Sequence, residues 1–140
     1  MAYEYRTHRR IEWADTDAAG IIYFVNYFRY MEQAEHEFLR SLGLTVLLEV
    51  DGVKVTWPRV AASCEFLRPV RFEDVIDIHL SVTRKGARSL TYAAVFTKDG
   101  SEVARGQLTV ACCRLTDGAI EPIAIPELIA AKIDQRPGPG

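Results

Sequence analysis

The chain has no excess of charge of either sign: 17 lysine and arginine residues stand against 19 aspartate and glutamate residues, for a formal net charge of −2. This balance lacks the basic footprint of nucleic-acid-binding proteins. The sequence also has no run of 18 apolar residues, the length that a membrane span needs, and residues 1–6 show no signal-peptide pattern. We therefore expect a cytoplasmic protein that binds no nucleic acid and does not span a membrane.

Residues for thiol and metal chemistry are also scarce. The chain has three cysteines and three histidines: Cys64, Cys112, Cys113, His8, His36 and His79. An odd number of cysteines without framework spacing favours reduced thiols buried as small hydrophobes. No histidine has another ligand-type residue at metal spacing. We expect structural or surface histidines, no cysteine nucleophile and no metal site.

One long amphipathic helix is predicted over residues 23–42, where apolar side chains recur every three or four positions. Gly43 is well placed to end this helix in the left-handed conformation. Glu32, Glu35 and Glu37 interrupt the apolar pattern, so we expect all three to face away from the core.

The remaining pattern is typical of strands. Period-two alternation predicts strands over residues 3–14, 53–67 (interrupted by Pro58), 75–83, 89–97 and 102–115, followed by a short helical segment at 126–134. Residues 44–52 are expected to form a connection with a helical turn. Short turns favour antiparallel neighbours. The sequence therefore predicts an α+β domain, residues 1–135, with a five-stranded antiparallel sheet wrapped around one helix. Residues 136–140 are predicted to be a disordered tail.

The stretch from Asp15 to Tyr27 places two acids and a glycine-containing turn directly before the predicted helix. It fails the calcium-loop pattern, which needs further acidic ligands at its fifth and twelfth positions. A helix start collects unpaired backbone N–H groups, so an N–H near Phe24 can polarise a carbonyl oxygen while Asp17 acts at its carbon. Gly20 lets a ligand approach the backbone. For Asp15 a turn role is expected, and for Asp17 a turn role stays the alternative to chemistry.

Two further features each have two interpretations. The turn from Arg84 to Arg88 is either a solvated hairpin turn or a site where cationic side chains bind phosphate. Trp57, beside Pro58, either packs in the core or an interface or lines a pocket.

The segment Asp-Thr-Asp-Ala-Ala-Gly-Ile-Ile-Tyr-Phe-Val-Asn-Tyr at residues 15–27 resembles the signature of acyl-CoA thioesterases of the 4-hydroxybenzoyl-CoA thioesterase type. Their pattern is roughly D-x-D-x-x-G-[IV]-[IV]-[YFW]-x-x-x-Y. The resemblance continues through the helix to Gly43 and Leu44, and in the order of elements it covers nearly the whole chain. It implies a hot-dog fold and hydrolysis of an acyl-CoA to the free acid and CoA, with no separate cofactor.

The resemblance also implies roles for individual residues. Asp17 is the expected catalytic carboxylate, as nucleophile or general base, and the Phe24 N–H is the expected oxyanion donor. Tyr23, Asn26 and Tyr27 match positions near the site.

The resemblance extends to both ends of the substrate. The carboxylate of Glu32, which is usually aspartate in aryl-specific members, is expected to reach the acyl group from the partner subunit. Trp57 and Arg59 are expected to line the same acyl region. The expected CoA-binding residues lie in the basic turn: Arg84, Lys85, Arg88 and Ser89.

Three functional hypotheses follow. The first is an acyl-CoA thioesterase for a small, aromatic or short aliphatic acyl group. The second is a non-catalytic acyl-CoA binding module, although burying an acid such as Asp17 beside a thioester gains nothing for a pure binder. The third is a hot-dog dehydratase, which is disfavoured because no histidine base lies between Arg10 and Glu35. An exposed sheet edge and one uncovered helix face predict a homodimer, or a dimer of dimers.

Overall fold

A computed structural model of the protein describes residues 2–138. In chain order its elements are β1 (Glu4–Arg10), η1 (Trp13–Asp15), α1 (Val25–Ser41), β2 (Leu48–Val50), β3 (Val53–Thr56), β4 (Arg59–Phe66), β5 (Val75–Lys85), β6 (Ser89–Lys98), β7 (Ser101–Ala111), β8 (Cys113–Thr116), β9 (Ala119–Pro122) and α2 (Glu127–Ala130).

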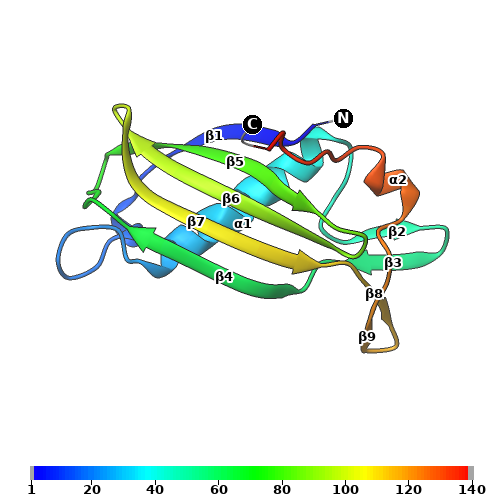
Figure 1. Cartoon of the computed structure of the whole chain (residues 1–140). Helices are drawn as coiled ribbons and strands as arrows, with labels where there is room; N and C mark the ends of the chain where they lie inside the picture. Colours follow the sequence, from blue (N-terminus) through cyan, green and yellow to red (C-terminus); the bar gives the residue numbers. More distant parts are fainter. Residues whose placement is uncertain (1, 139–140) are drawn as a thin grey trace.

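The main sheet has five antiparallel strands in the order β1-β5-β6-β7-β4, so β1 and β4 form its edges. Figure 1 shows that the long helix α1 lies across one face of this curved sheet. The predicted α+β class, with a five-stranded antiparallel sheet wrapped around one long helix, is confirmed. Because α1 crosses the sheet obliquely, its first turns lie near the edge strand β4.

Helix α1 buries one apolar face against the sheet, and Phe38, Ala34 and Met31 are among its least exposed residues. It begins two residues later than predicted because the Tyr23 N–H donates to the Asp15 carbonyl (2.8 Å), which keeps Tyr23 in the preceding loop. It ends as predicted, with Gly43 in the left-handed region at φ +76°.

One prediction about this helix is wrong. Glu35 was expected on the solvent face, but it is a buried residue, 1% exposed. Its partner is Arg59 on strand β4, 24 residues away in the chain, and the period of the helix gives no sign of a partner outside the helix.

Two predicted strands are each broken in two. The 53–67 strand separates into β3 and β4 at Trp57-Pro58, and the 102–115 strand separates into β7 and β8 at Cys112, whose N–H donates to the Arg88 carbonyl (2.7 Å). At the first of these breaks, Pro58 has no N–H to contribute to the hydrogen-bond ladder of a sheet, so the chain changes direction at Pro58.

A second sheet, which the sequence pattern did not predict, has the strand order β2-β3-β8-β9. Its hairpins turn at Asp51-Gly52 and Asp117-Gly118, where all four residues have positive φ. Asp-Gly turns of this kind join two antiparallel strands closely. The outer strands β2 and β9 were missed because three or four residues are too few to show alternation.

The C-terminal segment runs back along the main sheet. Helix α2 has one turn, shorter than the predicted 126–134 segment. Beyond it, the Asp134 N–H donates to the Ala2 carbonyl (2.8 Å) and the Arg136 N–H donates to the Val82 carbonyl (2.7 Å). Of the predicted disordered tail, residues 139–140 lie outside the described residues. Within residues 2–138, no helix is long and apolar enough to cross a bilayer.

Candidate functional site

The loop that carries Asp17 is closed by its own backbone. The Asp17 N–H donates to the Ile21 carbonyl and the Gly20 N–H donates to the Asp17 carbonyl, each over 2.9 Å. Gly20 has φ +79°, and nothing lies within 4 Å of the position that a Cβ would take. The Asp17 carboxylate accepts the Ala19 N–H (2.9 Å) and is exposed to solvent. This tight turn presents the carboxylate outward.

Asp15 and Asn26 join this loop to the start of α1. The Asp15 carbonyl accepts hydrogen bonds from the Tyr23 N–H (2.8 Å) and from the Asn26 amide (2.9 Å). The Asp15 carboxylate accepts the Glu12 N–H (2.9 Å), which fits the turn role expected for it. Asn26 is buried and also accepts a hydrogen bond from Arg29 (3.1 Å). Asn26 therefore fixes the loop relative to the helix.

Asp17, Phe24 and Tyr27, which sequence reasoning assigned to one site, line one cavity of about 350 Å³. The other lining residues are Ile21, Ile22, Phe66, Leu67, Arg68, Pro69 and Val70. Phe66 makes aromatic contacts with Phe24 (ring centroids 5.9 Å apart) and Tyr27 (5.5 Å). Burial raises the pKa of Tyr27 to about 12, so its phenol stays neutral at ordinary pH.

The backbone at the start of α1 leaves donors free. Within residues 2–138, neither Phe24 nor Val25 donates its N–H to a carbonyl, whereas Asn26 and Tyr27 donate to Tyr23 and Phe24. Unpaired N–H groups at a helix start, next to an apolar cavity, suit a developing negative charge. Phe24, whose N–H has no carbonyl acceptor within residues 2–138, therefore lines the same cavity as Asp17.

A second cavity, of about 250 Å³, lies next along the groove between α1 and β4, and we call it the Glu32 cavity. It is lined by Val25, Phe28, Arg29, Met31, Glu32, Arg59, Ala62 and Leu108. Val25 and Phe28 follow Phe24 and Tyr27 directly in the sequence, so the two cavities are neighbours on α1. Of the predicted acyl-binding residues, Glu32 and Arg59 lie here, and Trp57 is buried beside them, 4% exposed.

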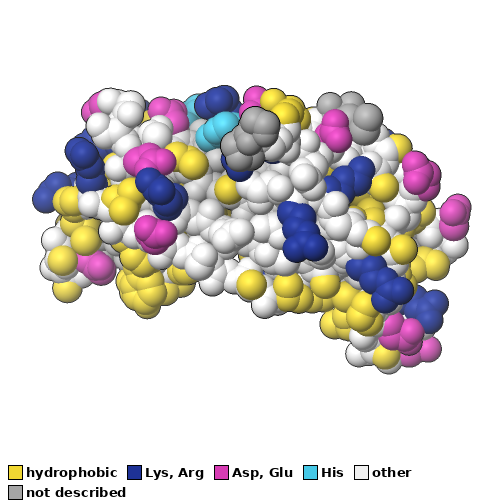
Figure 2. All heavy atoms as spheres, in the orientation of Figure 1, with side chains coloured by type: hydrophobic (Ala, Val, Ile, Leu, Met, Phe, Trp, Pro, Cys, Tyr) yellow, Lys and Arg dark blue, Asp and Glu magenta, His cyan; other side chains and the backbone are white. Residues whose placement is uncertain are grey.

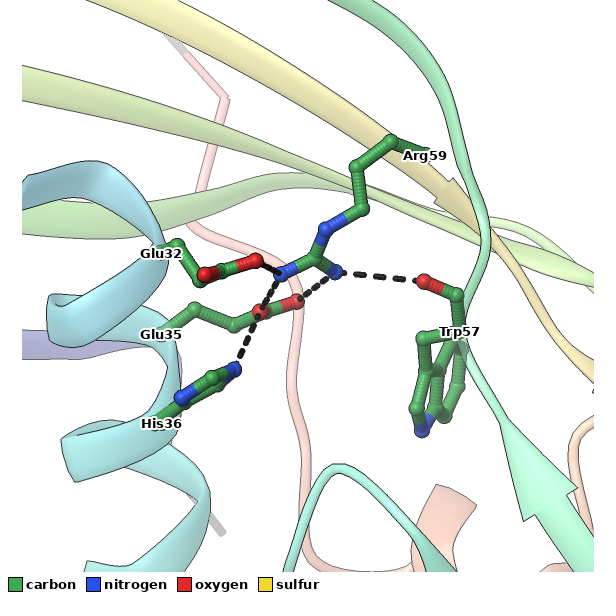
Figure 3. Close-up of polar contacts among 5 residues, drawn as sticks. All are labelled: Glu32, Glu35, His36, Trp57 and Arg59. Carbon is green, nitrogen blue, oxygen red and sulfur yellow. Dashed lines mark hydrogen bonds and ion pairs between the residues drawn. The ribbon is translucent and has the colours of Figure 1, made fainter. Parts of the chain in front are cut away.

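Arg59 is the centre of a charged cluster at the polar end of this cavity (Figure 3). Its guanidinium binds both carboxylate oxygens of Glu35 (2.6 and 3.1 Å), one oxygen of Glu32 (3.1 Å) and the Trp57 carbonyl (3.2 Å). Burial raises the pKa of Glu35, and the hydrogen bonds and charge of Arg59 oppose that rise. The His36 imidazole lies 3.8 Å from Glu35.

The predicted CoA-binding turn lies at the other end of the sheet. Figure 1 places the turn between β5 and β6 beside α2, opposite the loop that carries Asp17. Arg84 and Arg88 are exposed and Ser89 is half-buried. The Lys85 ammonium donates to the Ala130 and Ile133 carbonyls, each over 2.7 Å. One chain therefore does not bring this turn to Asp17.

Sequence reasoning missed several lining residues. Phe66, Arg68 and Val70 border a turn whose only signal was its Arg-Pro pair, and Glu35 has no signal because its arginine is distant in sequence. Tyr23, which was predicted to bind substrate, is half exposed and stacks edge-to-face on Phe24 (5.3 Å) without lining either cavity. No cluster of three or more His, Cys, Asp or Glu side chains suited to a metal occurs in the part of the chain that the structure describes.

Comparison with known proteins agrees with this geometry. A "Putative esterase" of Aquifex aeolicus (strain VF5) is 34% identical over 128 residues, covering 91% of this chain and 94% of the relative. A 1,4-dihydroxy-2-naphthoyl-CoA hydrolase of Thermosynechococcus vestitus (strain NIES-2133 / IAM M-273 / BP-1) is 29% identical over 120 residues, covering 84% and 82%. The solved structure of BH1999 gentisyl-coenzyme A thioesterase superposes with a TM-score of 0.79 at 30% identity, covering 90% of this chain and 99% of that one.

Residues 11–133 match the family described as the thioesterase-like superfamily, and these residues include the Asp17 loop, the long helix and four of the five strands of the main sheet, β1 lying before them. The chain therefore belongs to the thioesterase-like superfamily of hot-dog-fold thioester hydrolases.

Proposed function

We propose that the protein hydrolyses a small aromatic acyl-CoA to the free acid and CoA. The observation that carries the proposal is the single apolar cavity that holds both the Asp17 carboxylate and Phe24, whose N–H has no acceptor in residues 2–138. A thioester carbonyl bound there meets a hydrogen-bond donor at its oxygen and a carboxylate at its carbon. The apolar walls exclude water around the carbonyl, which strengthens its polarisation.

Two routes satisfy this geometry. In the first, Asp17 takes a proton from water, the resulting hydroxide attacks the carbonyl carbon, and the tetrahedral oxyanion is held by the Phe24 N–H. The intermediate then expels the CoA thiolate, which receives the proton from Asp17. In the second, the Asp17 carboxylate attacks the carbonyl carbon itself, the C–S bond breaks and CoA leaves as the thiolate, and water then hydrolyses the resulting mixed anhydride to the free acid and the Asp17 carboxylate. Rapid-quench trapping of the acyl-enzyme separates the two routes.

A second copy of the chain completes the proposed site. Strand β4 is an edge strand, and its neighbour within residues 2–138 is β7 alone. Figure 2 shows hydrophobic side chains along the lower edge of the molecule, where β4 runs in Figure 1. Val60 is 61% exposed and Phe66 is 49% exposed. Such an edge invites antiparallel pairing with another strand.

Pairing of two β4 strands brings different ends of the two copies together. Phe66 borders the Asp17 cavity, whereas Arg59, about 23 Å away along the strand, borders the Glu32 cavity. In a two-fold antiparallel pair, the Arg59 end of one copy lies beside the Phe66 end of the other. Glu32 and Arg59 of the second copy are then next to the Asp17 cavity, and the assembly is a dimer or a dimer of dimers.

Two further observations support the substrate class. The relatives named above act on gentisyl-CoA and 1,4-dihydroxy-2-naphthoyl-CoA, and the latter group is aromatic and carries hydroxyls. The Glu32 cavity is mostly apolar, with charge at one end.

The same two-fold pairing moves the exposed Arg84 and Arg88, with Ser89, toward the Asp17 end of the other copy, where we propose that they bind the CoA phosphates. Lys85 is already bonded to two carbonyls.

The test is release of free thiol from a panel of aromatic and short aliphatic acyl-CoA thioesters. We expect the wild type to act on at least one of them and Asp17→Asn to reduce kcat at least about 100-fold, the scale of one catalytic proton-transfer group. Asp15→Asn is the matched control, because asparagine still accepts the Glu12 N–H. Binding of every thioester with no release above the Asp17→Asn level would overturn the proposal and leave a binding module.

A further inference from the structure

The charged cluster around Arg59 is larger than the packing of α1 against β4 requires. Glu35 is 1% exposed, yet it is an ionisable residue on the buried face of α1. A buried ion pair is poor support for stability, because well-packed apolar residues of similar size often do as well. Stability therefore does not explain the Glu35–Arg59 pair. Its position at the polar end of the Glu32 cavity indicates a role in substrate binding.

Hydrogen-bond counting shows what Arg59 can still offer. A guanidinium has four N–H groups on its two Nη atoms and one on Nε. The Nη atoms already make four hydrogen bonds, two to Glu35, one to Glu32 and one to the Trp57 carbonyl. Binding a substrate carboxylate through these atoms would break at least one of these bonds. Arg59 is therefore not a free anion receptor.

Glu32 is the group at this end that remains available. Its side chain is 52% exposed, and one of its two oxygens is bonded to Arg59. Two carboxylates share the guanidinium of Arg59, so the group of Glu32, Glu35 and Arg59 has one negative charge in excess. The other cation that lines the cavity, Arg29, lies one helical turn before Glu32. Its guanidinium donates a hydrogen bond to Asn26. A ligand group placed here meets an anionic hydrogen-bond acceptor.

We propose that Glu35 is a positioning residue that sets acyl selectivity: by occupying the guanidinium of Arg59, it leaves Glu32 as an anionic acceptor that selects hydroxyl-bearing acyl groups and rejects carboxylate-bearing ones. The inference rests on the proposed function, in which this cavity receives the acyl group. Hydrogen bonds to a charged partner are stronger than neutral ones. The selection therefore acts as a ratio between substrates of the same shape.

The test compares kcat/KM for three thioesters of equal length: benzoyl-CoA, 4-hydroxybenzoyl-CoA and 4-carboxybenzoyl-CoA. We expect the wild type to prefer the hydroxyl compound over the unsubstituted one by about 10-fold to 100-fold, as a charge-assisted hydrogen bond allows. The carboxylate compound should be the poorest of the three. In Glu35→Gln, the charge of Arg59 is no longer neutralised by Glu35. The ratio of kcat/KM for the carboxylate compound to kcat/KM for the hydroxyl compound should therefore rise at least about 10-fold.

Glu37→Gln is the matched control, because it makes the same change on the same helix where the carboxylate binds Arg9 and Thr7 instead. Its substrate ratios should equal those of the wild type. If Glu35 has a merely structural role in α1, the substrate ratios of Glu35→Gln should also equal those of the wild type. If Glu35→Gln does not fold, Glu32→Gln removes the negative charge of the exposed acceptor, and the hydroxyl-to-unsubstituted ratio should fall about 10-fold.

The outcomes separate the two claims. Hydrolysis with flat ratios in the wild type, or unchanged ratios in folded Glu35→Gln, overturns the selectivity role and leaves the thioesterase proposal intact. Failure to hydrolyse any thioester overturns the thioesterase proposal. In that case, the dissociation constants of the same three compounds, measured by calorimetry, still show or refute the preference.

Discussion

The Lys85 ammonium donates hydrogen bonds to the carbonyl oxygens of Ala130 and Ile133, each over 2.7 Å. The backbone N–H of Lys85 also donates to the Gln135 side chain (2.8 Å). These bonds hold the segment after α2 against the end of β5. A residue whose charge suggested phosphate binding therefore tethers the C-terminal segment.

Lys85→Met should lower the free energy of unfolding by about 1–3 kcal/mol, because two carbonyls lose their donor while the apolar stem is kept. Urea denaturation measures the change. Lys54→Met, at an exposed position on β3, is the control and should change stability by less than about 0.5 kcal/mol. A large rise in KM for acyl-CoA at unchanged stability would instead assign Lys85 to the phosphates.

Glu37 should make stability depend on pH. Burial acts to raise the pKa of Glu37, but hydrogen bonds from Arg9 and Thr7 outweigh burial and hold the pKa below its ordinary value of 4.5. The folded state thus binds fewer protons than the unfolded state, so the stabilisation is full above pH 4.5 and is lost as the pH falls through the folded pKa.

Glu37→Gln should therefore be less stable than the wild type by about 0.5–1 kcal/mol at pH 7, a value reduced for solvent screening. The difference should shrink toward zero as the pH falls below the folded pKa, as measured by urea denaturation at several pH values. Glu127→Gln, at an exposed position on α2, should show no such trend. A difference that stays constant with pH would contradict the assignment to ionisation.

Cys64 should react slowly with alkylating reagents. Burial, with a smaller contribution from the charge of Glu65, raises the pKa of the Cys64 thiol to about 11 from an ordinary value of 9.0. The thiolate is the reactive species, so iodoacetamide at pH 8 should modify Cys64 about 100-fold more slowly than an ordinary thiol. Site-resolved mass spectrometry measures the rate, with urea-unfolded protein as the reference. A rate that stops rising near pH 9 would show an unperturbed thiol.

Val60→Glu should weaken the proposed dimer. Val60 lies on the free edge strand and is 61% exposed, so a charge there would be buried unpaired if two β4 strands join. Light scattering across a dilution series should show a higher dissociation constant, with loss of activity in parallel. Leu128→Glu, on exposed α2, is the matched control. An unchanged dimer in Val60→Glu would place the interface elsewhere.

The local signals in the sequence were sufficient for the fold class and for the long helix with its main sheet. The period of residues 23–42 and Gly43 located the helix, and period-two alternation located the strands of the main sheet, because these features depend on neighbours a few residues apart. The second sheet escaped prediction because β2 and β9 are stabilised by pairing with β3 and β8, not by a pattern of their own. Trp57-Pro58 likewise signalled an interruption, while the separation into two sheets was visible only in three dimensions.

For this protein, the sequence by itself determined the long helix, the strands of the main sheet, the family motif and the loop that presents Asp17 ahead of α1, since all of these are encoded in contiguous residues. Only the tertiary structure decided that Phe66 closes the Asp17 cavity, that Lys85 is bonded to the C-terminal segment, and that buried Glu35 holds Arg59. Each of these contacts joins residues far apart in the chain. Their formation depends on how the strands cross the helix, which no local pattern encodes.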